Sequence, residues 1–193
     1  MSKLAIPKHV ALEEFMTEEE KVLRDAARGF VEGVIMPVRQ QVDADEREHK
    51  LIGSILKQIS VDLGSQRMVF PAKYGGIEIT SVRTFYWAIE ELGRGDSGMA
   101  LAALCTDWIF VPIVFEPYRR EDLLEEFAKT FCEDKLHLGC FAMTEPQGGC
   151  DIENVDVMKG RTIKTTATLE GDEWVINGEK QWPSNSGVAS LYL

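Results

Sequence analysis

The stretch FAMTEPQGGCDIEN, residues 141–154, separates two parts of the chain that have different sequence patterns. It runs from apolar residues into Thr-Glu-Pro (144–146) and then into the glycine pair 148–149. Proline stiffens the backbone and removes one N–H donor, whereas glycine lets another molecule approach the backbone closely. Taken alone, the stretch is best explained as a loop between strands. The alternative is a segment that presents donors to a flat heterocycle with carbonyl oxygens.

The residues before this stretch have helical periodicity. Thr17 and Glu20 form a capping-box pattern, and apolar residues recur at helical spacing after it. Pro37 should end or kink this first helix, and Gly64 suits a helix C-cap. Further amphipathic helices are predicted over 51–63, 82–92 and 121–130, and a hydrophobic helix over 99–108 or beyond, after a break at 93–98.

The residues after the stretch have strand character. In TTATLEGDEWVINGEKQW, residues 165–182, apolar and polar side chains alternate on either side of a turn at Gly171-Asp172. Asn177-Gly178 is a hairpin signal, because both residues accept positive φ. ASLYL, residues 189–193, indicates another strand.

Together these patterns predict a multi-domain fold of the α and β class. We expect an all-α N-terminal helical domain over residues 1–136, followed by an antiparallel β-domain over residues 137–193. A chain that ends inside an apolar strand leaves that strand without a ladder partner. The β-domain is therefore expected to be incomplete as given.

Composition excludes several functional classes. The net charge of −11 disfavours general binding to nucleic acid or to anionic membranes. The apolar run 98–115 contains Asp107 and Pro112, so it predicts a buried helix rather than a membrane span. A carboxylate at Asp107 must pair, face solvent or line a pocket. The N-terminus shows no secretory signal and the four cysteines form no CxxC pair, which favours a cytoplasmic protein with reduced thiols.

A second stretch, KQWPSNSG (residues 180–187), places Trp182 two residues before Ser184. An aromatic face next to a hydroxyl donor suits stacking on one part of a planar ring and hydrogen bonding to another part. A tryptophan that packs in the core of a β-domain is the simpler alternative.

The two stretches together resemble the acyl-CoA dehydrogenase family. Upstream, FPAKYGG (70–76) resembles that family's Pro-Glu-x-Tyr-Gly-Gly loop, and IEELGRGDSG (89–98) resembles its Glu-Glu-Leu-x-Arg-x-Asp helix end. The resemblance implies a helical N-terminal domain, a middle β-domain and a C-terminal four-helix domain, of which this sequence covers the first and part of the second. The matching residues in the two stretches and between them are Thr144, Glu145, Pro146, Gly149, Asp151, Asn177, Gly178, Lys180, Trp182, Ser184 and Asn185.

The resemblance implies α,β-desaturation of an acyl-CoA thioester with FAD as cofactor, in which a carboxylate removes the α-proton and the β-hydrogen leaves as hydride to flavin N5. Cys150 stands where the family usually has a serine that contacts the thioester ligand. The catalytic base is expected beyond residue 193, so no catalytic residue is assigned within the chain. The cofactor-binding residues that the resemblance implies are Phe141, Met143, Thr144, Gly149, Trp182 and Ser184.

Two departures from the family pattern, Cys150 and Pro183, keep other activities open. One alternative is a flavoprotein of the same fold with other chemistry, such as monooxygenation or non-redox cleavage. Another is a non-catalytic subunit of a heteromeric acyl-CoA dehydrogenase. The resemblance also implies a homotetramer that passes electrons to an electron-transferring flavoprotein, with no nucleic acid and no membrane span.

Overall fold

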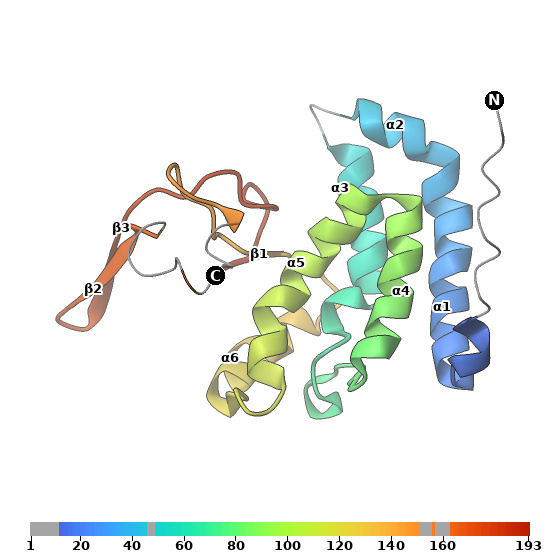
Figure 1. The fold of residues 1–193 in the computed structure, drawn as a ribbon, viewed down its shortest axis with the longest axis horizontal. Coiled ribbons are helices and arrows are strands. Elements are labelled where there is room, and N and C mark those ends of the chain that lie inside the picture. Colours follow the sequence, from blue (N-terminus) through green and yellow to red (C-terminus); the bar gives the residue numbers. More distant parts are fainter. Residues whose placement is uncertain (1–11, 46–48, 151–155, 157–162) are drawn as a thin grey trace.

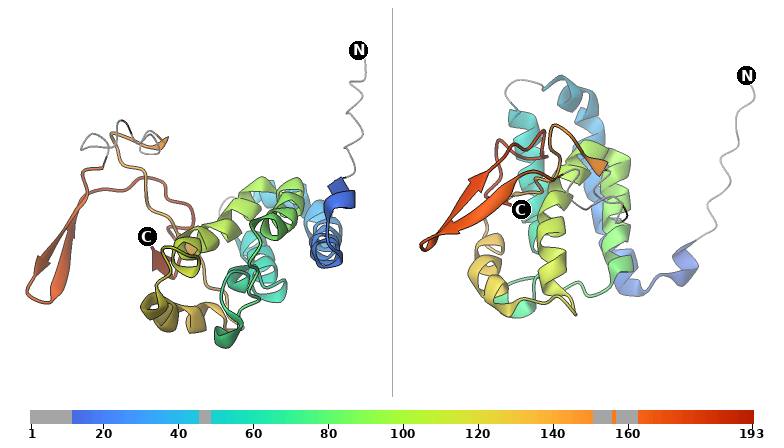
Figure 2. Two further views of the ribbon diagram at one scale, coloured as in Figure 1. Left: turned by 60° about the horizontal axis from the view of Figure 1, so that its bottom comes forward. Right: turned by 60° about the vertical axis from the view of Figure 1, so that its left-hand side comes forward.

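The computed structural model describes residues 12–45, 49–150, 156 and 163–193, and it divides into a helical bundle and a smaller strand-containing region (Figure 1). The β2–β3 hairpin projects away from the bundle in Figure 1 and in the left-hand view of Figure 2. A helical N-terminal part followed by a small sheet region confirms the predicted fold class. The elements are α1 (Glu18–Phe30), α2 (Arg39–Ala44), α3 (Lys50–Lys57), α4 (Val82–Gly95), α5 (Ser97–Val114), α6 (Glu121–Phe131), β1 (Gly139–Cys140), β2 (Thr166–Glu170), β3 (Glu173–Asn177) and β4 (Leu191–Tyr192).

Helix α1 begins at the predicted capping box. The Glu20 N–H donates to Thr17 Oγ1 at 3.2 Å, and the Thr17 N–H donates to Glu20 Oε2 at 2.8 Å. After α1 the chain passes through a π-helical turn and then a 3₁₀ turn that contains Pro37, before α2 begins. The prolyl ring cannot continue a regular helix, so the predicted kink at Pro37 is confirmed.

Buried carboxylates join α1 to α4. Glu20 is buried and pairs with Arg83 Nε at 2.7 Å, although it also belongs to the capping box. Glu91 is buried as well, and it pairs with Arg28 of α1 and with Arg94. A buried carboxylate is costly unless it is paired and hydrogen-bonded, so these ion pairs specify how α1 lies against α4.

The junction of α4 and α5 is tighter than the sequence pattern predicted. A break was expected over residues 93–98, but α4 continues to Gly95 and α5 begins at Ser97. Asp96 alone separates them, because its Oδ1 accepts the Met99 N–H at 2.9 Å and caps α5. Helix α5 is long and apolar enough to cross a membrane by length and composition alone, and half of it is buried within the described structure.

The strands form two separate pairs in the part of the chain that the structure describes. β2 and β3 are antiparallel around the Gly171-Asp172 turn, where Gly171 has φ +69. β1 and β4 are parallel, with Gly139 opposite Leu191, so this pair differs from the antiparallel arrangement that was expected. Asn177-Gly178 makes no hairpin there. β3 ends at Asn177, and the chain runs back to the loop after β1, where the Gln181 N–H donates to Thr144 O at 2.9 Å.

β1 lies directly on α5 at Gly139. The Gly139 N–H donates to Thr106 Oγ1 at 2.9 Å. A Cβ atom at Gly139 would lie 2.6 Å from Ile109 Cδ1 and 2.9 Å from Thr106 Cα. Only a residue without a side chain allows this close approach, so Gly139 determines where the strand region meets the bundle.

We expect Gly139→Ala to lower the free energy of unfolding by about 1–3 kcal/mol, since the added methyl overpacks a buried contact with backbone atoms. The matched control is Gly29→Ala in α1, where a Cβ atom would meet nothing within 4 Å. That change should raise stability by about 0.5–1 kcal/mol, because alanine is the better helix former. Urea unfolding of both variants measures the two changes in the free energy of unfolding. Equal changes would contradict the close approach of Gly139 to α5.

Candidate functional site

The loop that follows β1 carries most of the predicted cofactor-binding residues. Phe141, Met143 and Thr144 are half-buried. Among the described residues, no acceptor takes a hydrogen bond from the N–H groups of Met143 and Thr144. Gly149 lies next to Thr144, since a Cβ atom there would be 3.6 Å from Thr144 Cγ2. Cys150 follows it and is exposed. The loop therefore brings these residues together and presents adjacent backbone donors.

Glu145 holds this loop in place. Its side chain is only 3% exposed and accepts the N–H groups of Lys164 at 2.6 Å and Thr165 at 3.1 Å. Lys180 Nζ donates to Glu145 Oε1 at 2.9 Å and to Met143 O at 3.1 Å. The carboxylate thus connects the loop to the two residues before β2 and to the segment after β3. Glu145 and Lys180 matched the family motif, but no role was predicted for either.

The hydrogen bonds at Glu145 favour its charged form. The Thr165 hydroxyl contributes most, although its geometry falls short of a full hydrogen bond, and the Lys164 N–H and the Lys180 ammonium follow. Together they hold the pKa of the Glu145 carboxyl well below its usual range. This glutamate therefore favours its charged form and anchors the loop through hydrogen bonds.

Trp182 and Ser184 lie on one turn next to the loop. Trp182 is 80% exposed and has φ +38, so its indole is presented outward rather than packed in a β-domain core. Ser184 is half-buried, and its hydroxyl lies beside the buried thiol of Cys105 on α5. Burial raises the pKa of Cys105, and the Ser184 hydroxyl opposes part of that rise. Ser184 therefore contacts α5 and is also one of the predicted cofactor-binding residues.

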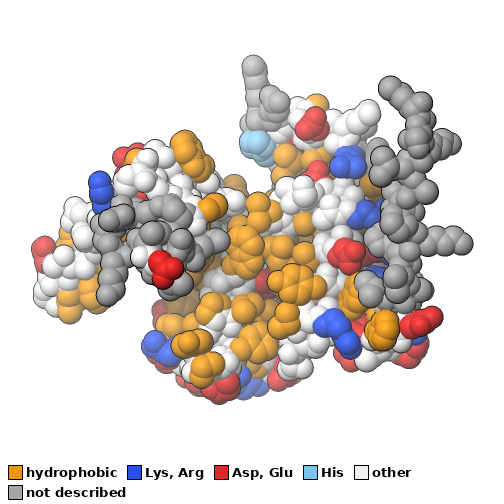
Figure 3. Space-filling view, viewed as in Figure 1, with side chains coloured by type: hydrophobic (Ala, Val, Ile, Leu, Met, Phe, Trp, Pro, Cys, Tyr) orange, Lys and Arg blue, Asp and Glu red, His pale blue; other side chains and the backbone are white. Residues whose placement is uncertain are grey.

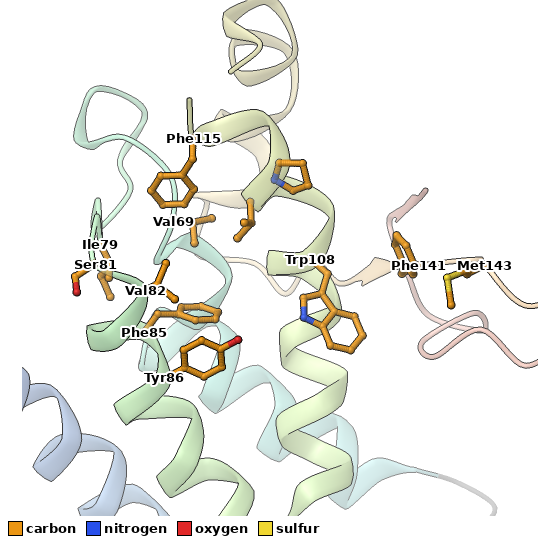
Figure 4. Close-up of a pocket in the computed structure, with 12 residues that line it drawn as sticks. Val69, Ile79, Ser81, Val82, Phe85, Tyr86, Trp108, Phe115, Phe141 and Met143 are labelled. Carbon is orange, nitrogen blue, oxygen red and sulfur yellow. The ribbon is translucent and has the colours of Figure 1, made fainter. Parts of the chain in front are cut away.

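A cavity of about 480 Å³ opens between the loop and the bundle (Figure 4). Trp108 of α5 lies between the α4 side chains and the loop side chains Phe141 and Met143 (Figure 4). The Trp108 and Phe141 rings meet edge to face, with centroids 6.5 Å apart. Apolar side chains also gather over the face of α4 and α5 (Figure 3). The lining residues are Val69, Ile79, Ser81, Val82, Phe85, Tyr86, Trp108, Val111, Pro112, Phe115, Phe141 and Met143.

The α4 and α5 members of this lining were not predicted as site residues. The segment 82–92 was predicted only as an amphipathic helix, and Trp108 only marked the end of a predicted hydrophobic helix. Their shared face depends on how α4 packs against α5, and no local sequence pattern reports that packing. The amphipathic spacing of α4 was the available signal, and it could not separate a cavity wall from core.

Asp107 does not line this cavity. It is 2% exposed, and its Oδ1 has no hydrogen-bond partner among the described residues. Burial raises the pKa of the Asp107 carboxyl well above its ordinary value, which favours the uncharged acid. Of the possibilities that the sequence left open, the described residues show neither a partner for Oδ1 nor a place for Asp107 in the wall of this cavity.

The loop and turn fit a flat heterocycle with carbonyl oxygens. The N–H groups of Met143 and Thr144 have no acceptor among the described residues and supply adjacent donors. The outward Trp182 follows Gln181, whose N–H donates to Thr144 O, and supplies an aromatic face near them. Fixed donors of this kind stabilise negative charge that develops on a ring during reduction. A flavin is therefore compatible with the residues present.

We expect Glu145→Gln to destabilise the loop, because an amide places a donor against the N–H groups that Glu145 now accepts. The lowered pKa gives a pH signature. The charged Glu145 carboxylate contributes its full stabilisation above the unfolded-state pKa of about 4.3. This stabilisation is lost as the pH falls toward the lowered folded-state pKa. Urea unfolding across this range should show a wild-type advantage over Glu145→Gln that shrinks on acidification. The exposed Glu173→Gln in β3 is the control, and an advantage that is constant with pH would contradict the assignment.

Comparisons with known proteins agree with this architecture. The chain is 30% identical over 178 residues to a cyclohex-1-ene-1-carbonyl-CoA dehydrogenase of Geobacter metallireducens, covering 92% of this chain and 43% of that protein. The fold matches butyryl-CoA dehydrogenase from Megasphaera elsdenii with a TM-score of 0.73 and 26% identity, over 92% of this chain and 43% of that one. It also matches a chain in the structure of the electron transferring flavoprotein of Acidaminococcus fermentans, with a TM-score of 0.69, 27% identity and the same coverage.

The chain thus spans less than half the length of these relatives. The family model for the N-terminal domain of acyl-CoA dehydrogenase matches residues 17–117, and the model for the middle domain matches residues 140–193. The chain therefore belongs to the acyl-CoA dehydrogenase family, and its cofactor is FAD.

Proposed function

We propose that residues 1–193 form the FAD-contacting and acyl-binding part of an enzyme that desaturates an acyl-CoA thioester between its α and β carbons. The observation that carries this proposal is the shared wall of the cavity. Phe141 and Met143 belong both to the predicted FAD segment and to the apolar lining, opposite Trp108. An apolar group in this cavity would lie next to a flavin on the loop.

The residues of this chain would bind and orient the cofactor and the substrate, and they would exclude water from the site. The N–H groups of Met143 and Thr144 would hold the cofactor, and Cys150 would contact the thioester. The apolar lining would hold the acyl group and keep water from the reacting carbons. Bound FAD supplies the hydride acceptor at N5 for the β-hydrogen. The α-proton requires a carboxylate, and we propose that this base comes from a position outside residues 1–193, as the resemblance to the family implies.

The wider assignments follow from the same family. The division into a helical domain (1–136) and a middle β-domain (137–193) accords with the matched family models. The similarity to a chain in an electron transferring flavoprotein structure supports a flavoprotein of that type as the electron acceptor. A homotetramer in the cytoplasm completes the proposal.

The proposal is tested on the native protein that carries this chain, purified with its FAD. Anaerobic addition of butyryl-CoA or cyclohexane-1-carbonyl-CoA should bleach the flavin and yield the corresponding enoyl-CoA. Bleaching only with an added reductant, or product formation only with oxygen, would indicate that the protein performs chemistry other than desaturation on the same fold. A preparation that binds no FAD would instead favour the non-catalytic subunit.

A bulky side chain at Val82 tests the acyl cavity. Val82 lines the cavity and is 64% exposed, so Val82→Trp narrows it without disturbing the core. We expect the affinity for acyl-CoA to fall about tenfold, as for the loss of one well-buried apolar contact, while the FAD content stays unchanged. Val22→Trp on α1 is the control, since Val22 is 70% exposed and lies outside the lining. Isothermal titration with an acyl-CoA measures both, and equal affinities would place the acyl group elsewhere.

A further inference from the structure

Asn185 joins the turn that carries Trp182 and Ser184 to both parts of the molecule. Its Nδ2 donates to Ala102 O of α5 at 2.8 Å and to Gly139 O of β1 at 2.9 Å. These acceptors lie 83 and 46 positions away in the chain, so the amide is a long-range connection rather than a local turn contact. Both protons of one amide group are used, and the side chain is half-buried.

The turn itself, residues 182–189 and here called the arch, has an uncommon backbone. Trp182 has φ +38 and Asn185 has φ +67, so two non-glycine residues in the arch occupy the left-handed region. Such conformations cost free energy and persist where the surroundings over-determine them. Inside the arch, the Ser186 N–H donates to Pro183 O at 3.1 Å, and the Val188 N–H donates to Asn185 O at 2.9 Å. The external hydrogen bonds of Asn185 are the contacts that can offset the strain.

We propose that Asn185 is a positioning residue for the FAD site, which holds Trp182 and Ser184 in fixed places by hydrogen-bonding the arch to α5 and β1. The proposal rests on the FAD site proposed above. Ala102 and Trp108 belong to the same helix, so the anchor of the arch and the wall of the acyl cavity move as one rigid element. Asn185 thereby keeps Trp182 and Ser184 at fixed positions relative to the cavity.

The anchor is tested first on the native protein that carries this chain, by amide hydrogen exchange of Ser186, Val188 and Ala189. Asn185→Gly keeps the left-handed backbone accessible but removes the amide, and Asn185→Asp keeps the size but sets carboxylate oxygens against two carbonyls. Both should speed exchange in the arch about tenfold or more, as for the loss of two hydrogen bonds. Val188→Ala is the control, because Val188 is exposed. Unchanged rates in both variants would overturn the proposal, and so would an equal rise in α1, which would show general loosening.

A double-mutant cycle then tests whether Asn185 acts through Trp182. FAD affinity is measured from the quenching of flavin fluorescence in the native protein, for wild type, Asn185→Gly, Trp182→Ala and the double variant. If Asn185 positions the indole, Asn185→Gly should weaken FAD binding about tenfold with Trp182 present and far less without it. Equal losses in both backgrounds would overturn the positioning role. Absence of FAD binding in the wild type would count against the proposed function, whereas the exchange experiment would still decide the anchor.

Discussion

The contact of Gly139 with α5 is the constraint on which the rest of the site depends. Thr106 is buried, and its hydroxyl accepts the Gly139 N–H, so β1 can lie on the helix only where no side chain intervenes. The Gly139 carbonyl is used by Asn185, and the loop of the site begins two residues later. Thr106 faces β1 and Trp108 faces the cavity, so one helix sets the position of both the strand region and the cavity wall.

Beyond this contact, polar interactions hold the site. All residues of the β2–β3 hairpin are exposed, so apolar burial within the described residues does little to fix the loop against it. Glu145 does so instead, because it accepts two backbone N–H groups and the Lys180 ammonium at once. This arrangement uses the side chain for anchoring and leaves the backbone N–H groups of Met143 and Thr144 free among the described residues. A loop held through its own backbone donors would have had none to offer a cofactor.

Local signals in the sequence predicted local structure well. The capping box at Thr17 and the left-handed C-cap at Gly64 each depend on a few neighbouring residues, and both are present. Asn177-Gly178 failed as a hairpin signal because a turn needs a strand on its far side, and the following residues bond to the loop at Thr144 instead. The contacts of Asn185 link residues far apart in the chain, so no spacing rule could reveal them.

Apolar surroundings raise the pKa of a carboxyl group, and Asp107 is an example elsewhere in the bundle. That carboxyl lies inside the bundle without a partner for its Oδ1 among the described residues, and burial raises its pKa, so the form that could accept a proton is disfavoured. A carboxylate kept permanently inside the apolar cavity would be shifted in the same direction. General-base catalysis needs a carboxylate whose pKa is matched to its task and which reaches the α-carbon in the bound complex. The base that we propose outside residues 1–193 would have to meet both needs in the bound complex.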